Sequence, residues 1–169
     1  MIILTSWRQA NVLVDQNGHA RLTEYGLAPI NSDPRFAVPA IPGAVGISGW
    51  SAPEIIEPSC DSNGISVMES KPADVFSFAM FAVEVFAGTV PFERQTLTIA
   101  ALRIIRGERP EMPGNAPDVG LTDEMWKHLE SCWQQDPKKR STMEEVVKEW
   151  RKFVEHNGDG NFGIATECV

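Results

Sequence analysis

The sequence feature that most constrains the fold is a mostly apolar run over residues 75–90, interrupted by Ser77 and Glu84. Placed on a helix over Ala73–Ala87, its apolar side chains surround the whole circumference, which is typical of a helix buried on all sides. Gly88 is suited to end this helix, because glycine readily adopts the left-handed conformation. The run is too short and too polar to cross a membrane. We therefore expect a buried central helix and no membrane-spanning segment.

Three further helices are expected after the central one. One covers Thr98–Arg106, and the next covers Asp123–Trp133 with Thr122 as its N-cap. The last begins at Ser141–Glu144, where the serine and glutamate side chains are spaced to satisfy each other's backbone amides. We expect this helix to end at Gly158, after an apolar stripe made of Val146, Val147, Trp150, Phe153 and Val154.

The N-terminal part of the chain has a different pattern. Val12–Val14 and His19–Leu22 flank Asp15–Gly18, whose Asn-Gly pair favours the tight turn of a β-hairpin. The stretch from Glu24 to Pro53 is rich in proline and glycine and has neither a helical nor a strand period. It predicts an irregular loop of roughly 25–30 residues, and loops of that length in compact domains are usually functional or disordered.

The composition excludes several classes of function. The 169 residues carry a net charge of −8, which disfavours a general nucleic-acid binder, since such proteins are basic. The three cysteines form no CxxC pair and are too few and too scattered for a disulfide scaffold or a metal site. This usage favours a reducing compartment, and we expect a cytoplasmic location. The three histidines share no spacing that is typical of metal ligands or of a catalytic triad.

Five short motifs then follow one another in an order and spacing that carry a resemblance. They are Asn11–Asp15, Glu24–Gly26, Gly49–Glu54, Lys71–Phe78 and Cys132–Arg140. Together they resemble the C-terminal lobe of the eukaryotic protein kinases over roughly residues 10–153. The Trp before Ser-Ala-Pro-Glu, the Cys-Trp pair and Arg106–Pro110 are similar to the tyrosine-kinase-like serine/threonine group, especially its fungal members.

The resemblance implies the fold class and the domain organisation. We expect a mainly α protein-kinase-like C-lobe, a helical body with a small β-hairpin at one edge, without the N-lobe. Residues 1–9 form an atypical start where the match is lost, 10–156 form the C-lobe, and 157–169 form a flexible tail.

The resemblance also implies which residues hold the cofactors, ATP and Mg²⁺. Asn11 occupies the position of the magnesium-binding Asn, and Glu24 replaces the magnesium-binding Asp. The extra methylene of glutamate displaces the carboxylate, and a misplacement of about 1 Å can cost about 10²-fold in rate. Spacing by itself favours a simpler interpretation, in which Asn11 caps a loop and Glu24 is a solvated charge.

Three further positions depart from the pattern of an active kinase. Ser6 stands where the family has its general-base Asp, five residues before the Asn, and Arg8 stands at the catalytic-loop Lys position. Serine does not accept a proton at neutral pH, and arginine does not replace lysine freely. In the substrate platform, Ile47 replaces a threonine three residues before Trp50.

The positions that resemble the structural residues of the family are retained. Glu54 and Arg140 are expected to form a buried ion pair, and Asp74 to anchor the catalytic loop from the central helix. Trp50 and Trp133 are expected to be packing residues.

The sequence therefore predicts a protein-kinase-domain chain that is catalytically inactive and acts as a pseudokinase-like module binding an unidentified protein. Intact relatives phosphorylate serine or threonine on proteins with ATP. Two alternatives stay open: a fragment or mis-started form of an active serine/threonine kinase, and a decayed product without function. In the last case the exposed hairpin residues Val12 and Leu13 would favour aggregation.

Overall fold

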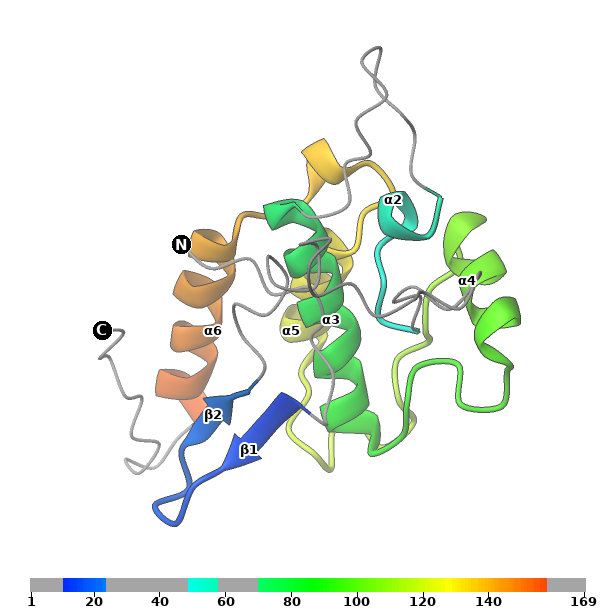
Figure 1. Ribbon diagram of the computed structural model, residues 1–169. Coiled ribbons are helices and arrows are strands. Elements are labelled where there is room, and N and C mark those ends of the chain that lie inside the picture. The colour runs from blue at the N-terminus through cyan, green and yellow to red at the C-terminus, as the bar shows by residue number, and fades with distance from the viewer. Residues whose placement is uncertain (1–10, 24–48, 58–69, 158–169) are drawn as a thin grey trace, which may run out of the picture.

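A computed structural model describes residues 11–23, 49–57 and 70–157 of the chain. The fold is mainly helical, with one two-stranded hairpin at its edge (Figure 1). Helix α3 (Lys71–Ala87) runs through the middle of the molecule, with the hairpin and α6 on one side of it and α4 on the other. This arrangement confirms the expected mainly α class with a hairpin at one edge.

Helix α3 is the core of the fold, as its apolar pattern predicts. Its N-cap Ser70 accepts a hydrogen bond from a backbone N–H of the first turn, and Gly88 closes the helix in the left-handed conformation at φ 69°. The side chains of Phe76 and Met80 are completely buried. Val85 is 57% exposed, so the helix is covered on most sides but not on all of them.

Helices α5 (Asp123–Cys132) and α6 (Met143–Asn157) pack beside α3 in succession. Thr122 caps α5 as expected, accepting a hydrogen bond from the N–H of Met125. On α6, the Trp150 ring lies edge-on to Phe78 of α3, with ring centroids 5.5 Å apart. These aromatic contacts join α6 to the core.

The start of α6 corrects two predictions from the sequence. The reciprocal cap is made by Thr142 and Glu145, not by Ser141 and Glu144: the Glu145 carboxylate accepts the Thr142 N–H at 2.7 Å, and the Thr142 hydroxyl accepts the Glu145 N–H at 3.2 Å. The Ser141 hydroxyl instead lies 2.8 Å from that of Ser131 on α5. The predicted apolar stripe is also narrower, because Val147 is 44% exposed.

Three shorter helices complete the body. Helix α4 (Leu97–Ile105) matches the expected helix within one residue at each end and packs against α2 (Pro53–Ile56). Neither α2 nor the 3-10 turn η2 (Pro137–Lys139) was predicted, because four and three residues are too few to show a period.

The hairpin pairs β1 (Val12–Val14) with β2 (Ala20–Leu22) in antiparallel register. Asp15 organises the turn, accepting the backbone N–H groups of Asn17 and His19 and pairing with Arg21 at 2.9 Å. The His19 N–H above all, and then Arg21, lower the pKa of Asp15 to about 2.

The hairpin also leaves apolar side chains uncovered, as expected for Leu13, which is 57% exposed. None of the helices in the described ranges has both the length and the apolar character of a membrane span. The irregular stretch over 24–48, the helix end at Gly158 and the tail lie outside the described residues.

Candidate functional site

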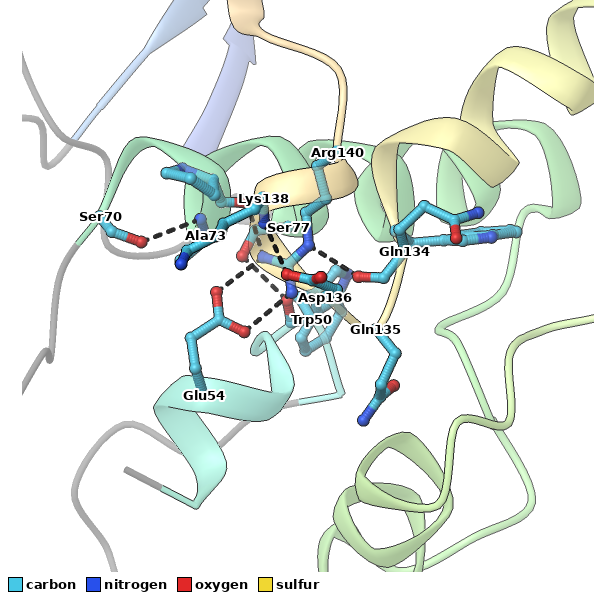
Figure 2. Close-up of polar contacts among 12 residues, drawn as sticks. Trp50, Glu54, Ser70, Ala73, Ser77, Gln134, Gln135, Asp136, Lys138 and Arg140 are labelled. Carbon is cyan, nitrogen blue, oxygen red and sulfur yellow. Dashed lines mark hydrogen bonds and ion pairs between the residues drawn. The ribbon is translucent and has the colours of Figure 1, made fainter. Parts of the chain in front are cut away.

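The guanidinium of Arg140 makes four hydrogen bonds where several segments of the chain meet. Its side chain is fully buried, and it donates to both carboxylate oxygens of Glu54 on α2, at 2.6 and 2.8 Å. It also donates to the carbonyl oxygens of Pro72, at the start of α3, and Gln134, each at 2.8 Å. Figure 2 shows Glu54 reaching from α2 toward Arg140. The predicted buried pair is therefore present, and it joins α2, α3 and the segment before α6.

A second arginine lies beside this pair. The Arg109 guanidinium is 4.9 Å from the Phe76 ring centroid, and that of Arg140 is 5.1 Å from the same ring. Burial and the nearby Arg140 charge lower the pKa of Arg109 to about 10, while Glu54 opposes this shift. The Glu54 carboxylate therefore pairs directly with Arg140 and also acts at longer range on the charge of Arg109.

Trp50 is held by the two polar residues that interrupt the apolar run of α3. Its indole N–H donates to the Glu84 carboxylate at 2.9 Å, and the Ser77 hydroxyl donates to its backbone carbonyl at 2.9 Å. Glu84 is only 4% exposed. The role of Glu84 was not predicted, although a charge inside an otherwise apolar helix is a signal that it needs a polar partner.

Two of the positions that resemble the family's magnesium and loop-anchoring residues are buried. Asn11, directly before β1, is 6% exposed, and its backbone carbonyl accepts the N–H of Thr23 at 2.8 Å. Asp74, in the first turn of α3, is 9% exposed. The role of Asn11, as a magnesium ligand or as the cap of a loop, stays a prediction.

Ser6, Arg8, Glu24 and Ile47 lie outside the described residues. Within residues 11–23, 49–57 and 70–157, no three His, Cys, Asp or Glu side chains are grouped to hold a metal ion. The fit of Mg²⁺ to the Asn11 and Glu24 pair therefore remains a prediction.

An open groove lies where α4 meets the end of α5. Its volume is about 400 Å³, and it is lined by Gly107, Arg109, Pro110, Glu130, Trp133, Gln134 and Gln135. Arg109 links the residues that line the groove, because it donates to the carbonyl of Trp133 at 2.9 Å and to the Gln135 side chain at 2.7 Å. These hydrogen bonds connect the end of α4 to the segment that follows α5.

Comparison with known proteins identifies the family to which this chain belongs. A family model described as "Protein tyrosine and serine/threonine kinase" matches residues 6–150. The chain belongs to the protein kinase family. Glu54, Asp74 and Arg140 all lie inside the match, and so do Ser6 and Glu24. The resemblance of the five motifs to this family is thus confirmed.

Several of the similar proteins are named as serine/threonine-protein kinases. The chain is 32% identical over 157 residues to a serine/threonine-protein kinase/receptor of Acanthamoeba polyphaga mimivirus, covering 92% of the chain and 8% of the relative. It is 28% identical to a serine/threonine-protein kinase of Arabidopsis thaliana over 94% of the chain and 25% of that protein. It is 30% identical to mitogen-activated protein kinase kinase kinase 1 of the same plant, covering 95% of the chain and 24% of that protein.

The chain therefore spans a quarter or less of the length of these relatives. Kinases of this family use ATP and Mg²⁺, and their catalysis depends on positioned metal, a phosphate cradle and a proton-accepting Asp. Of the positions expected to carry these parts, the described residues include Asn11, which is buried.

Proposed function

We propose that this chain is the helical lobe of a cytoplasmic pseudokinase, which binds a protein partner and does not transfer phosphate. The observation that carries the proposal is a contrast within the matched region. The buried network of Glu54 and Arg140 is complete, whereas Ser6 stands at the position of the general base.

The losses of rate expected from the residues at positions 6 and 24 are together large enough to abolish useful turnover. Losing a general base costs about 10²–10⁴-fold in rate. A displaced metal ligand, as expected for Glu24 in place of Asp, costs about 10²-fold more. Since kinases turn over at about 1–100 s⁻¹, a combined loss of about 10⁴-fold leaves a rate below about 10⁻² s⁻¹.

The intact network supports a folded module in place of a decayed product. Arg140 alone joins three segments through four hydrogen bonds. The net charge of −8 favours a protein partner over nucleic acid.

Phosphate transfer from radiolabelled ATP to casein tests the proposal. The full-length gene product that contains this chain is assayed beside its Asn11→Ala variant, with folding checked by circular dichroism. We expect both proteins to give the same background signal. Mg²⁺-dependent transfer that Asn11→Ala abolishes would overturn the proposal and establish the alternative, an active serine/threonine kinase.

Nucleotide binding provides a second readout. We expect millimolar ATP with Mg²⁺ to leave the unfolding temperature of the wild-type protein unchanged, because binding to the native state alone raises it. A Mg²⁺-dependent rise that Asn11→Ala removes would show that the metal position still functions.

A further inference from the structure

The interface between α5 and α6 encloses a ring nitrogen that has no hydrogen-bond partner. His128 lies in the middle of α5 and is half-buried. Its Nε2 atom is shielded from solvent and accepts or donates no hydrogen bond within the described part of the chain. Buried polar atoms of folded proteins are nearly always hydrogen-bonded, so this exception requires an explanation. The proposed function makes no use of this histidine.

Two carboxylates of α6 act on the His128 ring. The start of α6 adjoins the end of α5, because the hydroxyls of Ser131 and Ser141 are 2.8 Å apart. His128 lies one turn before Ser131, and Glu145 and Glu149 follow Ser141 at successive turns of α6. Burial lowers the pKa of His128 below its ordinary value of 6.5, whereas the charges of Glu149 and then Glu145 oppose this shift. The ring is therefore uncharged at neutral pH.

Both carboxylates have other partners while the ring is neutral. Glu145 caps α6, accepting the N–H and the hydroxyl of Thr142 at 2.7 and 3.1 Å. Glu149 accepts a hydrogen bond from Lys152 at 2.7 Å, and the side chains of this pair are 36% and 56% exposed. The exposed Lys148 lies between the two glutamates on the helix. Because exposed ion pairs stabilise a protein little, Glu149 changes its partner at a smaller cost than Glu145 does.

The other titratable groups of the helices around the ring are engaged, exposed or neutral. On α3, which also packs against α5, Asp74 and Glu84 are buried and have partners of their own. On α5 itself, Glu124 and Lys127 are exposed to solvent. Burial raises the pKa of the Cys132 thiol to about 11, so this thiol carries no charge at neutral pH. The carboxylates of α6 are therefore the acceptors available to a protonated ring.

We infer that the contact between α5 and α6 responds to protons: when His128 is protonated, the Glu149 carboxylate leaves Lys152 and accepts a hydrogen bond from Nε2 of the ring. A neutral imidazole carries one proton, which Nδ1 can hold, and Nε2 is then a bare acceptor. Uptake of a second proton from solvent places an N–H and a positive charge at the buried Nε2, and a buried charge without a partner is costly. One hydrogen bond of Glu149 breaks and another forms.

The exchange changes the surface of the protein as well as the interface. At neutral pH, the charges of Lys152 and Glu149 compensate each other on α6. After the exchange, the carboxylate is turned toward α5, and the exposed Lys152 has lost its counter-ion. The inference goes beyond the proposed function, because it gives the lobe a response to acidification.

A titration of the histidine ring by nuclear magnetic resonance tests the inference, with the full chain taken from about pH 8 to about pH 5. The ring signal of His128 is assigned through the backbone, so no histidine variant has to fold. We expect Glu149→Gln to lower the pKa of His128 further, because the carboxylate that favours the charged ring is removed. Lys152→Met should raise it, because Glu149 then has no competing partner.

Matched variants separate an exchange of partners from a general effect of charge. Glu144→Gln and Arg151→Met each remove an exposed charge from the same helix. We expect Glu144→Gln to lower the pKa of His128 less than Glu149→Gln does, and Arg151→Met to raise it less than Lys152→Met does. Equal effects within either matched couple would overturn the inference.

The carbon signal of the Glu149 carboxyl group provides the direct readout. It should move at the same pH as the His128 ring, well above the range in which a glutamate carboxyl itself titrates, while the Glu144 signal stays in place. A Glu149 signal that does not follow the ring contradicts the exchange. The casein assay is independent of this titration, so such a result contradicts the inference alone and leaves the proposed function standing.

Discussion

Removing the negative charge of Glu54 is the most informative perturbation of the fold. Glu54→Gln keeps the size of the side chain, but it leaves the fully buried Arg140 guanidinium without a counter-ion and close to Arg109. Breaking a buried ion pair from one side costs about 3–5 kcal/mol. In a protein whose total stability is about 5–15 kcal/mol, that is a large part of the free energy of unfolding.

Urea denaturation followed by tryptophan fluorescence measures this loss, and for a chain of this length the melting temperature should fall by roughly 10 °C. Glu149→Gln is the matched control, because Glu149 pairs with Lys152 at 2.7 Å while 36% of its side chain is exposed. The control should cost about 0–1 kcal/mol. Equal losses in the two variants would refute the claim that the Glu54 charge balances the buried cluster.

Four further predictions follow from single residues. Burial lowers the pKa of His128 below its ordinary value of 6.5, so the unfolded chain binds the proton more readily. The free energy of unfolding should decrease as the pH falls below that value, and less steeply in His128→Leu, measured by urea titration at several pH values. Burial raises the pKa of the Cys132 thiol to about 11, so iodoacetamide at neutral pH should label it only after unfolding, as peptide mass mapping would show. Glu84→Leu leaves the Trp50 indole N–H without its acceptor and should cost about 1–3 kcal/mol in urea denaturation, whereas Glu84→Gln should cost less. Thr142→Ala should lower stability by about 1 kcal/mol in the same measurement, because it removes the cap of α6.

The helices could be predicted where the sequence has both a clear pattern of apolar side chains and a residue suited to cap or end a helix. Helix α3 has an apolar circumference and a glycine end, and α5 has Thr122 before two acidic residues, so their bounds agree with the structure to within two residues. The cap of α6 was assigned one residue too early, because Ser141 and Thr142 each have a glutamate three residues later. Only the contact of Ser141 with Ser131 on α5 distinguishes them, and a local pattern does not contain it.

The candidate site could be predicted only in part, because its contacts join residues that lie far apart in the sequence. The Glu54–Arg140 pair spans 86 positions of sequence, and it was predicted from resemblance to the family, not from spacing. The link between Trp50 and Glu84 was missed, since nothing local connects residues 34 positions apart. A buried charge in an apolar helix needs a partner, and the sequence alone does not say which residue provides it.

Stability and chemistry are carried by different parts of this chain. The groups whose loss should cost several kcal/mol, such as Glu54 and Arg140, are buried between helices. Ser6, Glu24 and Ile47 belong to segments predicted as loops or as an irregular start, where substitutions usually change stability by less than about 0.5 kcal/mol. The lobe can therefore keep its fold whether or not it keeps its chemistry. For this reason a stable helical body is no evidence of phosphate transfer, and the denaturation and casein experiments measure independent properties of the protein.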